Sequence, residues 1–97
     1  MRKQINELLL QLGIPASLDG FNFITRAIEL SIKQKMAMCK GIYALIAEEN
    51  GTKAQRVERS IRHAITKIDK DVYPQYGGRY YRNQDVICTL ALHFKEE

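Results

Sequence analysis

Apolar residues in this chain recur at the three- and four-residue spacing of a helix face, and the first run ends at a glycine and a proline. That run contains Ile5, Leu8, Leu9 and Leu12, and it is followed by Gly13 and Pro15. Side chains three and four positions apart lie on the same side of an α-helix, so the spacing predicts an amphipathic helix. Glycine accepts the left-handed conformation that ends many helices, and proline cannot continue one.

Three further segments carry the same kind of pattern. The second begins near Asp19, a predicted N-cap, and continues with Phe21, Ile24, Ile28 and Ile32. The third, between Lys35 and Gly51, places Met38, Ile42, Leu45 and Ile46 on one side. The last begins at Asn83, also a predicted N-cap, and buries Val86, Ile87, Leu90, Ala91 and Phe94. With the helix described next, the pattern predicts an all-α fold: one domain over residues 1–97, a compact bundle of about five helices.

A tight turn joins the third predicted helix to a fourth. Asn50 and Gly51 end the third helix, because this pair favours turns. Thr52 and Gln55 have the spacing of a capping box, in which two side chains satisfy backbone N–H groups of the first helical turn. We therefore predict a helix over residues 53–68. A helix, a tight turn and a capped helix together predict a helix-turn-helix.

The net charge of +4 is concentrated in this fourth helix. Between residues 52 and 67 the only acid is Glu58. The bases of that segment are Lys53, Arg56, Arg59, Arg62 and Lys67. The rest of the chain is neutral on balance, so the positive field comes from one element and favours a polyanionic partner.

Polar and apolar residues separate cleanly around the fourth helix at about 100° per residue. The apolar side consists of Val57, Ile61, Ala64, Ile65 and Ile68. The opposite side consists of Gln55, Glu58, Arg59, Arg62 and Thr66, with Arg56 and His63 at one flank. The apolar side predicts contact with the core, and the polar side is a candidate surface for binding.

The polar side has two interpretations. As a recognition helix in the major groove, it would use arginine to bind guanine bidentately and Glu58 to accept from a cytosine amino group. An acid among arginines suits base recognition better than binding to phosphate alone, because it repels the DNA backbone. As an ordinary solvated helix, the same side would carry a surface ion pair between Glu58 and Arg62, which are four residues apart.

The segment from Arg79 to Arg82 alternates bases with tyrosines in the loop before the last helix. Arg79 and Arg82 are candidates for phosphate contacts beside the groove. The alternative is a loop whose tyrosines pack on the core and whose arginines are solvated.

Other functions lack sequence support. There is no Ser/His/Asp or Cys/His arrangement and no glycine-rich phosphate loop, so we predict no enzymatic activity and no cofactor. His63 and His93 have no carboxylate cluster around them, so no metal site is predicted. Cys39 and Cys88 lie in apolar patterns and are expected as a reduced pair in the core. The longest apolar run, Leu8 to Leu10, is far too short to cross a membrane.

Three stretches resemble a known family. They are LGIPASLDGFNFITRAIEL, the more specific RVERSIRHAI (Arg56 to Ile65), and NQDVICTLA near the end. They are similar to the C-terminal DNA-binding effector domain of the stage-zero sporulation protein A, a sporulation response regulator of endospore-forming bacteria.

The resemblance implies a helix-turn-helix that binds a short promoter box, usually as tandem copies. It implies base contacts by Glu58 and Arg59, and a position at the DNA interface for Arg56, Arg62 and His63. Gln55 stands where the family typically has serine. The segment before the last helix is shorter than in the family, and we expect no receiver domain.

The prediction is therefore a sequence-specific regulator of transcription that binds double-stranded DNA in the bacterial cytoplasm, associated with the nucleoid when bound. The base-reading residues are Gln55, Glu58, Arg59 and Arg62. The phosphate or flanking residues are Lys53, Arg56, His63, Arg79 and Arg82. RNA polymerase and a second copy of the chain are further candidate partners, and no membrane is expected. The alternative is an interaction module or antagonist that binds RNA polymerase or a related regulator without reading DNA.

Overall fold

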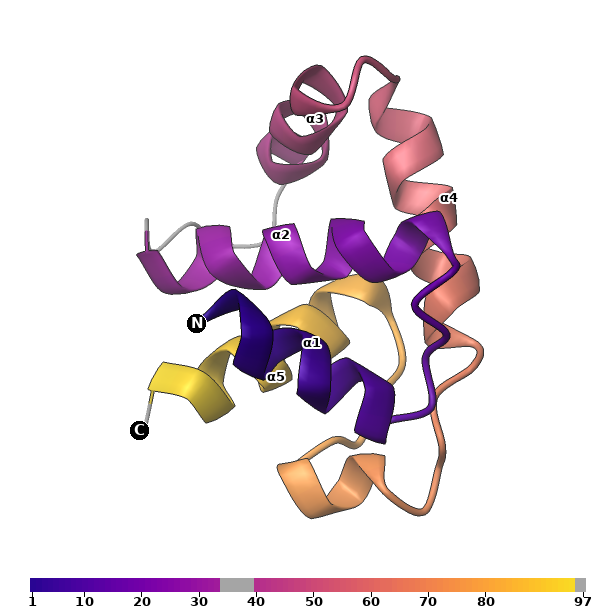
Figure 1. The fold of residues 1–97 in the computed structure, drawn as a ribbon, viewed down its shortest axis with the longest axis vertical. Helices are drawn as coiled ribbons and strands as arrows, with labels where there is room; N and C mark the ends of the chain where they lie inside the picture. Colours follow the sequence, from indigo (N-terminus) through magenta and orange to yellow (C-terminus); the bar gives the residue numbers. More distant parts are fainter. Residues whose placement is uncertain (34–39, 96–97) are drawn as a thin grey trace.

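Helix α2 (Asp19–Lys33) lies at the centre of the protein and contacts the four other α-helices (Figure 1). The computed structural model describes residues 1–33 and 40–95. The other helices are α1 (Arg2–Gln11), α3 (Lys40–Glu49), α4 (Ala54–Ile65) and α5 (Asn83–Lys95), and a short 3-10 helix, η1 (Tyr73–Tyr76), precedes α5. No strand occurs within the described residues, which confirms the predicted all-α fold with five α-helices.

The central position of α2 follows from its composition. Its buried apolar residues are Phe21, Phe23, Ile24, Ala27, Ile28 and Leu30, which lie on more than one side of the helix. A helix that is apolar on most sides must be covered by neighbours rather than by water. In Figure 1, α3 lies above α2, α1 and α5 lie below it, and α4 crosses its N-terminal end.

The predicted helix stops are confirmed at two glycines. Gly13 follows α1 with a φ of +90°, and Gly51 follows α3 with a φ of +64°. At the second stop, the Asn50 side-chain amide donates to the carbonyl of Ile46 over 2.7 Å. The chain can therefore turn from α3 directly into α4, in the order expected of a helix-turn-helix.

The predicted helix over residues 53–68 is too long at its C-terminal end. Helix α4 ends at Ile65, and the N–H groups of Thr66 and Lys67 donate to carbonyls three residues back. Four residues beyond the end of α4, the N–H of Asp69 donates to the carbonyl of Leu12 over 2.7 Å. This bond ties the segment after α4 to the end of α1. Ile68 is still buried, as predicted, although it lies outside the helix.

The three predicted side-chain caps are also wrong. Lys53, in extended conformation, is the N-cap of α4, and no side chain caps this helix. Thr52 lies in the turn instead, and its N–H donates to the carbonyl of Ala47. Asp19 and Asn83 are each the first residue of their helix, and their side chains bond to other helices. The predicted contributions of Met38 and Cys39 lie outside the described residues.

Gly20 allows α2 to approach α4 closely. A Cβ atom at this position would lie 2.1 Å from the backbone oxygen of Ser60 and 2.7 Å from the Cβ atom of Ala64. Both distances are below any van der Waals contact, and the first involves backbone, which no rotamer change can move. Any side chain here must push the two helices apart.

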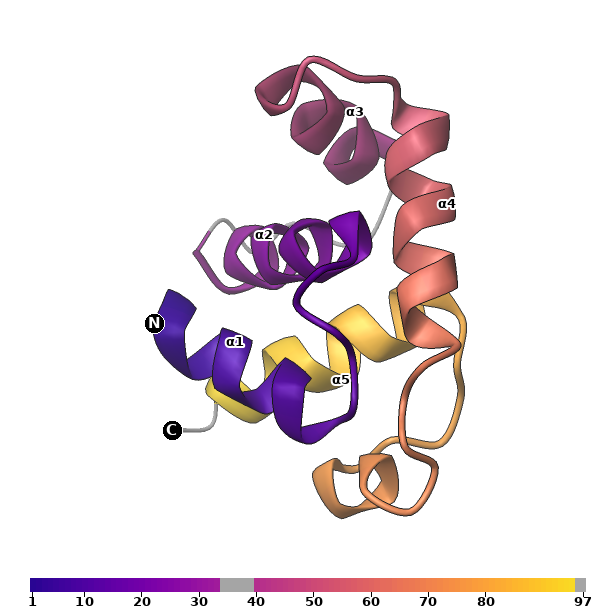
Figure 2. The ribbon, with the colours of Figure 1, turned by 45° about the vertical axis from the view of Figure 1, so that its right-hand side comes forward.

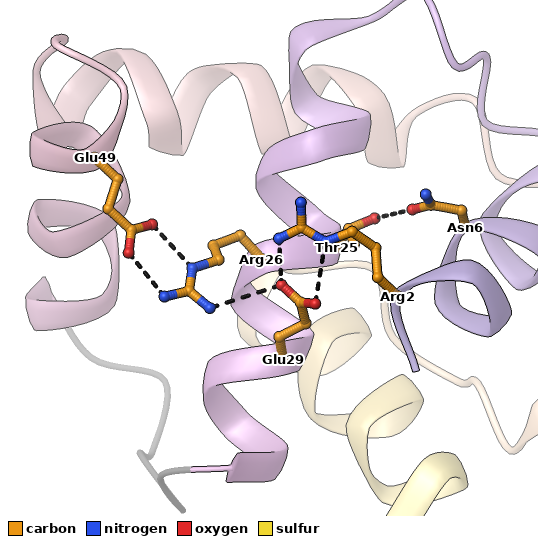
Figure 3. Close-up of polar contacts among 6 residues, drawn as sticks. All are labelled: Arg2, Asn6, Thr25, Arg26, Glu29 and Glu49. Carbon is orange, nitrogen blue, oxygen red and sulfur yellow. Dashed lines mark hydrogen bonds and ion pairs between the residues drawn. The ribbon is translucent and has the colours of Figure 1, made fainter.

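A chain of ion pairs joins α1, α2 and α3 (Figure 3). Arg2 binds both carboxylate oxygens of Glu29, with an Nε–Oε2 distance of 3.1 Å. Arg26 binds both oxygens of Glu49, at 2.9 and 2.8 Å, and its Nη1 atom lies 3.7 Å from Glu29. Glu29 is buried, so its charge depends on these partners. The hydrogen bonds from Arg2, assisted by the charges of Arg2 and Arg26, lower the pKa of Glu29 although burial opposes the shift.

We expect Gly20→Ala to lower the free energy of unfolding by about 1–3 kcal/mol, the usual cost of overpacking. The loss should appear although alanine favours a helix over glycine by about 1 kcal/mol. Denaturant unfolding measures it. Gly51→Asn is the control, because nothing lies within 4 Å of the added Cβ atom and asparagine tolerates a positive φ. A Gly20→Ala protein as stable as the parent would show that the helices separate without cost.

Glu29→Gln should destabilise the protein at neutral pH by on the order of 1 kcal/mol, a modest value because Arg2 is largely exposed. The folded pKa of Glu29 lies below its unfolded value of about 4.3, so the ionised group stabilises the fold above that pH. The contribution is lost as the pH falls through the folded pKa. The stability difference between parent and variant should therefore shrink in acid, whereas Glu7→Gln, at an exposed position of α1, should show little difference at neutral pH. A difference that does not change with pH would contradict the assignment.

Candidate nucleic-acid interface

Helix α4 runs along the outer edge of the molecule, with the other helices on one side of it (Figure 2). Its inner side is buried, and that side consists of Val57, Ile61, Ala64 and Ile65. Its outer side is exposed to solvent at Gln55, Arg59, Arg62 and Thr66, and Glu58 is partly exposed. The separation of core and polar residues predicted for this helix is confirmed.

The four predicted base-reading residues lie along this outer side. Gln55, Glu58, Arg59 and Arg62 are spaced at three, four and seven positions, so their side chains share one face of α4. We call this face, made of these four residues, the outer face of α4. Lys53, at the N-cap, and His63 are also exposed.

Glu58 and Arg62 form an ion pair. The distance from Glu58 Oε1 to Arg62 Nη1 is 3.4 Å, and the side chain of Arg62 is 63% exposed. A pair of this kind within one helix contributes about 0.3–0.5 kcal/mol. It is therefore weak enough to open when either side chain finds a better partner.

Arg56 is held by an acid from another helix. Its Nη2 atom donates to Asp19 Oδ2 over 2.9 Å, and both side chains are about as exposed as that of Arg62. Asp19 was expected to cap α2, so this pairing was missed. No local sequence pattern could indicate this pair, because the two residues are 37 positions apart and meet only when the helices pack.

Arg59 is the arginine of α4 that has no such partner. The chain has seven arginines, and carboxylates within the described residues pair with five of them: Arg2, Arg26, Arg56, Arg62 and Arg82. The other two arginines, Arg59 and Arg79, have no ion pair within the described part of the chain. A ligand could therefore bind the guanidinium group of Arg59 without first breaking an ion pair with another described residue.

Asn83 fixes the position of α4 relative to its neighbours. Its side-chain amide donates to the backbone oxygen of Glu58 over 3.1 Å and to the hydroxyl oxygen of Tyr43 over 3.3 Å. The buried residue thus joins α5 to α3 and α4, the two helices of the predicted helix-turn-helix. Burial raises the pKa of Tyr43, and the bond from Asn83 opposes this rise.

The segment from Arg79 to Arg82 combines packing with exposure. The ring of Tyr81 lies against that of buried Tyr73, with centroids 5.1 Å apart, but both Tyr80 and Tyr81 are exposed. The guanidinium carbon of Arg79 lies 6.0 Å from the ring centroid of Tyr80, and Arg82 Nε donates to Asp85 over 2.9 Å. The alternative interpretation, in which the tyrosines of this segment pack on the core, is thus met only by the contact of Tyr81 with Tyr73. A role of the two arginines in phosphate binding stays a prediction.

The expected pair of core cysteines is wrong for Cys88. Its side chain is exposed on α5, and Cys39 lies outside the described residues. Within residues 1–33 and 40–95, no group of His, Cys, Asp and Glu side chains is arranged to hold a metal ion. No helix in the described part of the chain is long and apolar enough to cross a membrane.

The chain matches a family model. The family described as "Sporulation initiation factor Spo0A C terminal" matches residues 5–86. The matched segment extends from α1 to the first turn of α5. It therefore includes every predicted site residue from Lys53 to Arg82.

Proposed function

The chain belongs to the family of Spo0A C-terminal domains, and we propose from that membership that it binds DNA sequence-specifically through α4 in the major groove. The family is one of DNA-binding domains of sporulation transcription regulators. Such a regulator acts where the bacterial chromosome lies, in the cytoplasm. The observation that carries the proposal is the outer face of α4, where Arg59 has no ion pair within the described residues and lies beside partly exposed Glu58.

The dimensions of α4 suit the groove. Twelve residues give a helix about 18 Å long at 1.5 Å per residue. The major groove of B-DNA is about 12 Å wide and admits a single helix with its side chains. Helix α4 is accessible along its outer edge, so the groove can receive it without moving the other helices.

Arg59 is our candidate for the main base contact. Arginine pairs bidentately with O6 and N7 of guanine, and such a contact discriminates by about 1–3 kcal/mol. Arg59 has no ion pair to break within the described residues, so this gain is not reduced by a competing partner.

Glu58 and Arg62 read bases only if their ion pair opens. Opening it costs about 0.3–0.5 kcal/mol, less than the gain from one good base contact. Glu58 would then accept from a cytosine amino group, and Arg62 and Gln55 would contact neighbouring bases. The ion pair thus does not prevent base recognition, but it lowers the net gain.

The flanking residues would bind phosphates and set the register of α4 on the duplex. Lys53, Arg56 and His63 would do so from α4 and its N-cap, and Arg79 and Arg82 from the loop before α5. Contacts of this kind give affinity that falls with salt, by about 0.9 in log K per unit of log salt for each phosphate neutralised.

Two substitutions at Arg59 test the base contact. Arg59→Ala should weaken binding to the preferred site by about 1–3 kcal/mol and flatten the preference at one base pair. Arg59→Lys keeps the charge but loses the bidentate geometry, so it should retain affinity for random duplex and lose the same preference. Site selection from a random library, followed by Kd measurements, gives both results. An unchanged consensus in both variants would contradict the role of Arg59.

A salt titration on random duplex tests the wider proposal. The Kd should rise with salt, because phosphate contacts release counterions. A protein that binds no duplex, or whose Kd does not depend on salt, would favour the interaction module that binds RNA polymerase or a related regulator.

A further inference from the structure

Asp19 brings a negative charge to the DNA-binding side of the molecule. As the first residue of α2, it extends its carboxylate to Arg56 of α4, at 2.9 Å. The contact joins a predicted phosphate-binding residue to an acid of another helix. Because both side chains are more than half exposed, the pair is not locked in the core and can exchange with other partners.

The backbone fixes this acid beside α4. The neighbouring residue, Gly20, lies so close to α4 that an added Cβ atom would meet the backbone oxygen of Ser60. The start of α2 therefore cannot move away from α4 without breaking a tight helix contact. Asp19 stays near Arg56 even when the ion pair opens.

Asp19 also borders two open hollows along α4. One, of about 370 Å³, includes Arg56 and Thr52 in its lining, and the other, of about 320 Å³, includes Arg59 and His63. Among the residues that the structure describes, Asp19 is the only acid in the lining of either hollow. A DNA strand that approached Arg56 in one hollow or Arg59 in the other would therefore meet the carboxylate of Asp19 as well.

We propose that Asp19 is a positioning residue that limits the affinity of the domain for DNA by holding Arg56. This inference rests on the proposed function. To bind a phosphate, Arg56 must first leave Asp19. This cost opposes binding regardless of base sequence, so Asp19 lowers non-specific affinity and leaves the preferred sequence unchanged.

Asp19→Asn tests the proposal, because it removes the charge and keeps the shape. The Kd for random duplex at about 0.1 M salt should fall about threefold to fivefold, the upper end of the effect of one exposed ion pair. The plot of log K against log salt should become steeper by up to about 0.9, one additional phosphate contact. The selected consensus should not change. A merely structural role of Asp19 would not produce a gain in affinity or a steeper slope.

Glu7→Gln is the matched control for net charge. Like Asp19→Asn, it removes one negative charge, but it does so at an exposed position of α1, a helix that makes no contact with α4. Its Kd should stay within about twofold of the parent, because exposed charges beyond about 10 Å are screened at 0.1 M salt. An equal gain in Glu7→Gln would attribute the effect to total charge and overturn the proposal.

Arg56→Gln separates the ion pair from the field of Asp19. If Asp19 acts by holding Arg56, then adding Asp19→Asn to Arg56→Gln should change the Kd by less than about twofold. A full gain in that background, or no gain in the parent background, overturns the inference while leaving DNA binding intact. A parent protein that binds no duplex contradicts the proposed function, and this inference with it.

Discussion

The close approach of α2 to α4 at Gly20 is the contact on which the position of α4 depends. Because Gly20 carries no side chain, the start of α2 rests against the backbone of Ser60. That support lets α4 bury one side and leave the opposite side in water. The same approach brings Asp19 within reach of Arg56. One glycine thus determines the position of α4 and allows the ion pair of Arg56 with Asp19.

Local patterns predicted the helices well, because helix formation and termination depend on neighbours a few residues away. The apolar spacing of Ile5, Leu8, Leu9 and Leu12 predicted α1, and Gly51 predicted the end of α3. The outer face of α4 could be predicted for the same reason, since 3.6 residues per turn decide which side chains share a side. The sequence also predicted that Val57 and Ile61 would be buried.

The caps and the partners of charged groups could not be predicted in this way. Thr52, Asp19 and Asn83 have suitable side chains for caps, but none has that role among the described hydrogen bonds. Asn83 bonds to Glu58 and Tyr43, and Asp19 to Arg56, across 25 to 40 positions of sequence. Such bonds depend on how helices pack, which no local pattern contains. The end of α4 was misjudged for a similar reason, because Asp69 bonds to Leu12 of a distant segment.

The ion pairs of the protein differ in how easily they open, and this difference bears on the proposed binding of DNA. Glu29 is buried and receives two hydrogen bonds from Arg2, so opening that pair would leave a desolvated charge. The pairs of Arg56 and Arg62 are exposed, and water can replace either partner at little cost. A polyanion would therefore exchange the pairs on α4 first, while the pairs that join α1, α2 and α3 stay closed. In the proposed binding mode, only exposed side chains of α4 would have to change partners, and the helices that support α4 would not have to move.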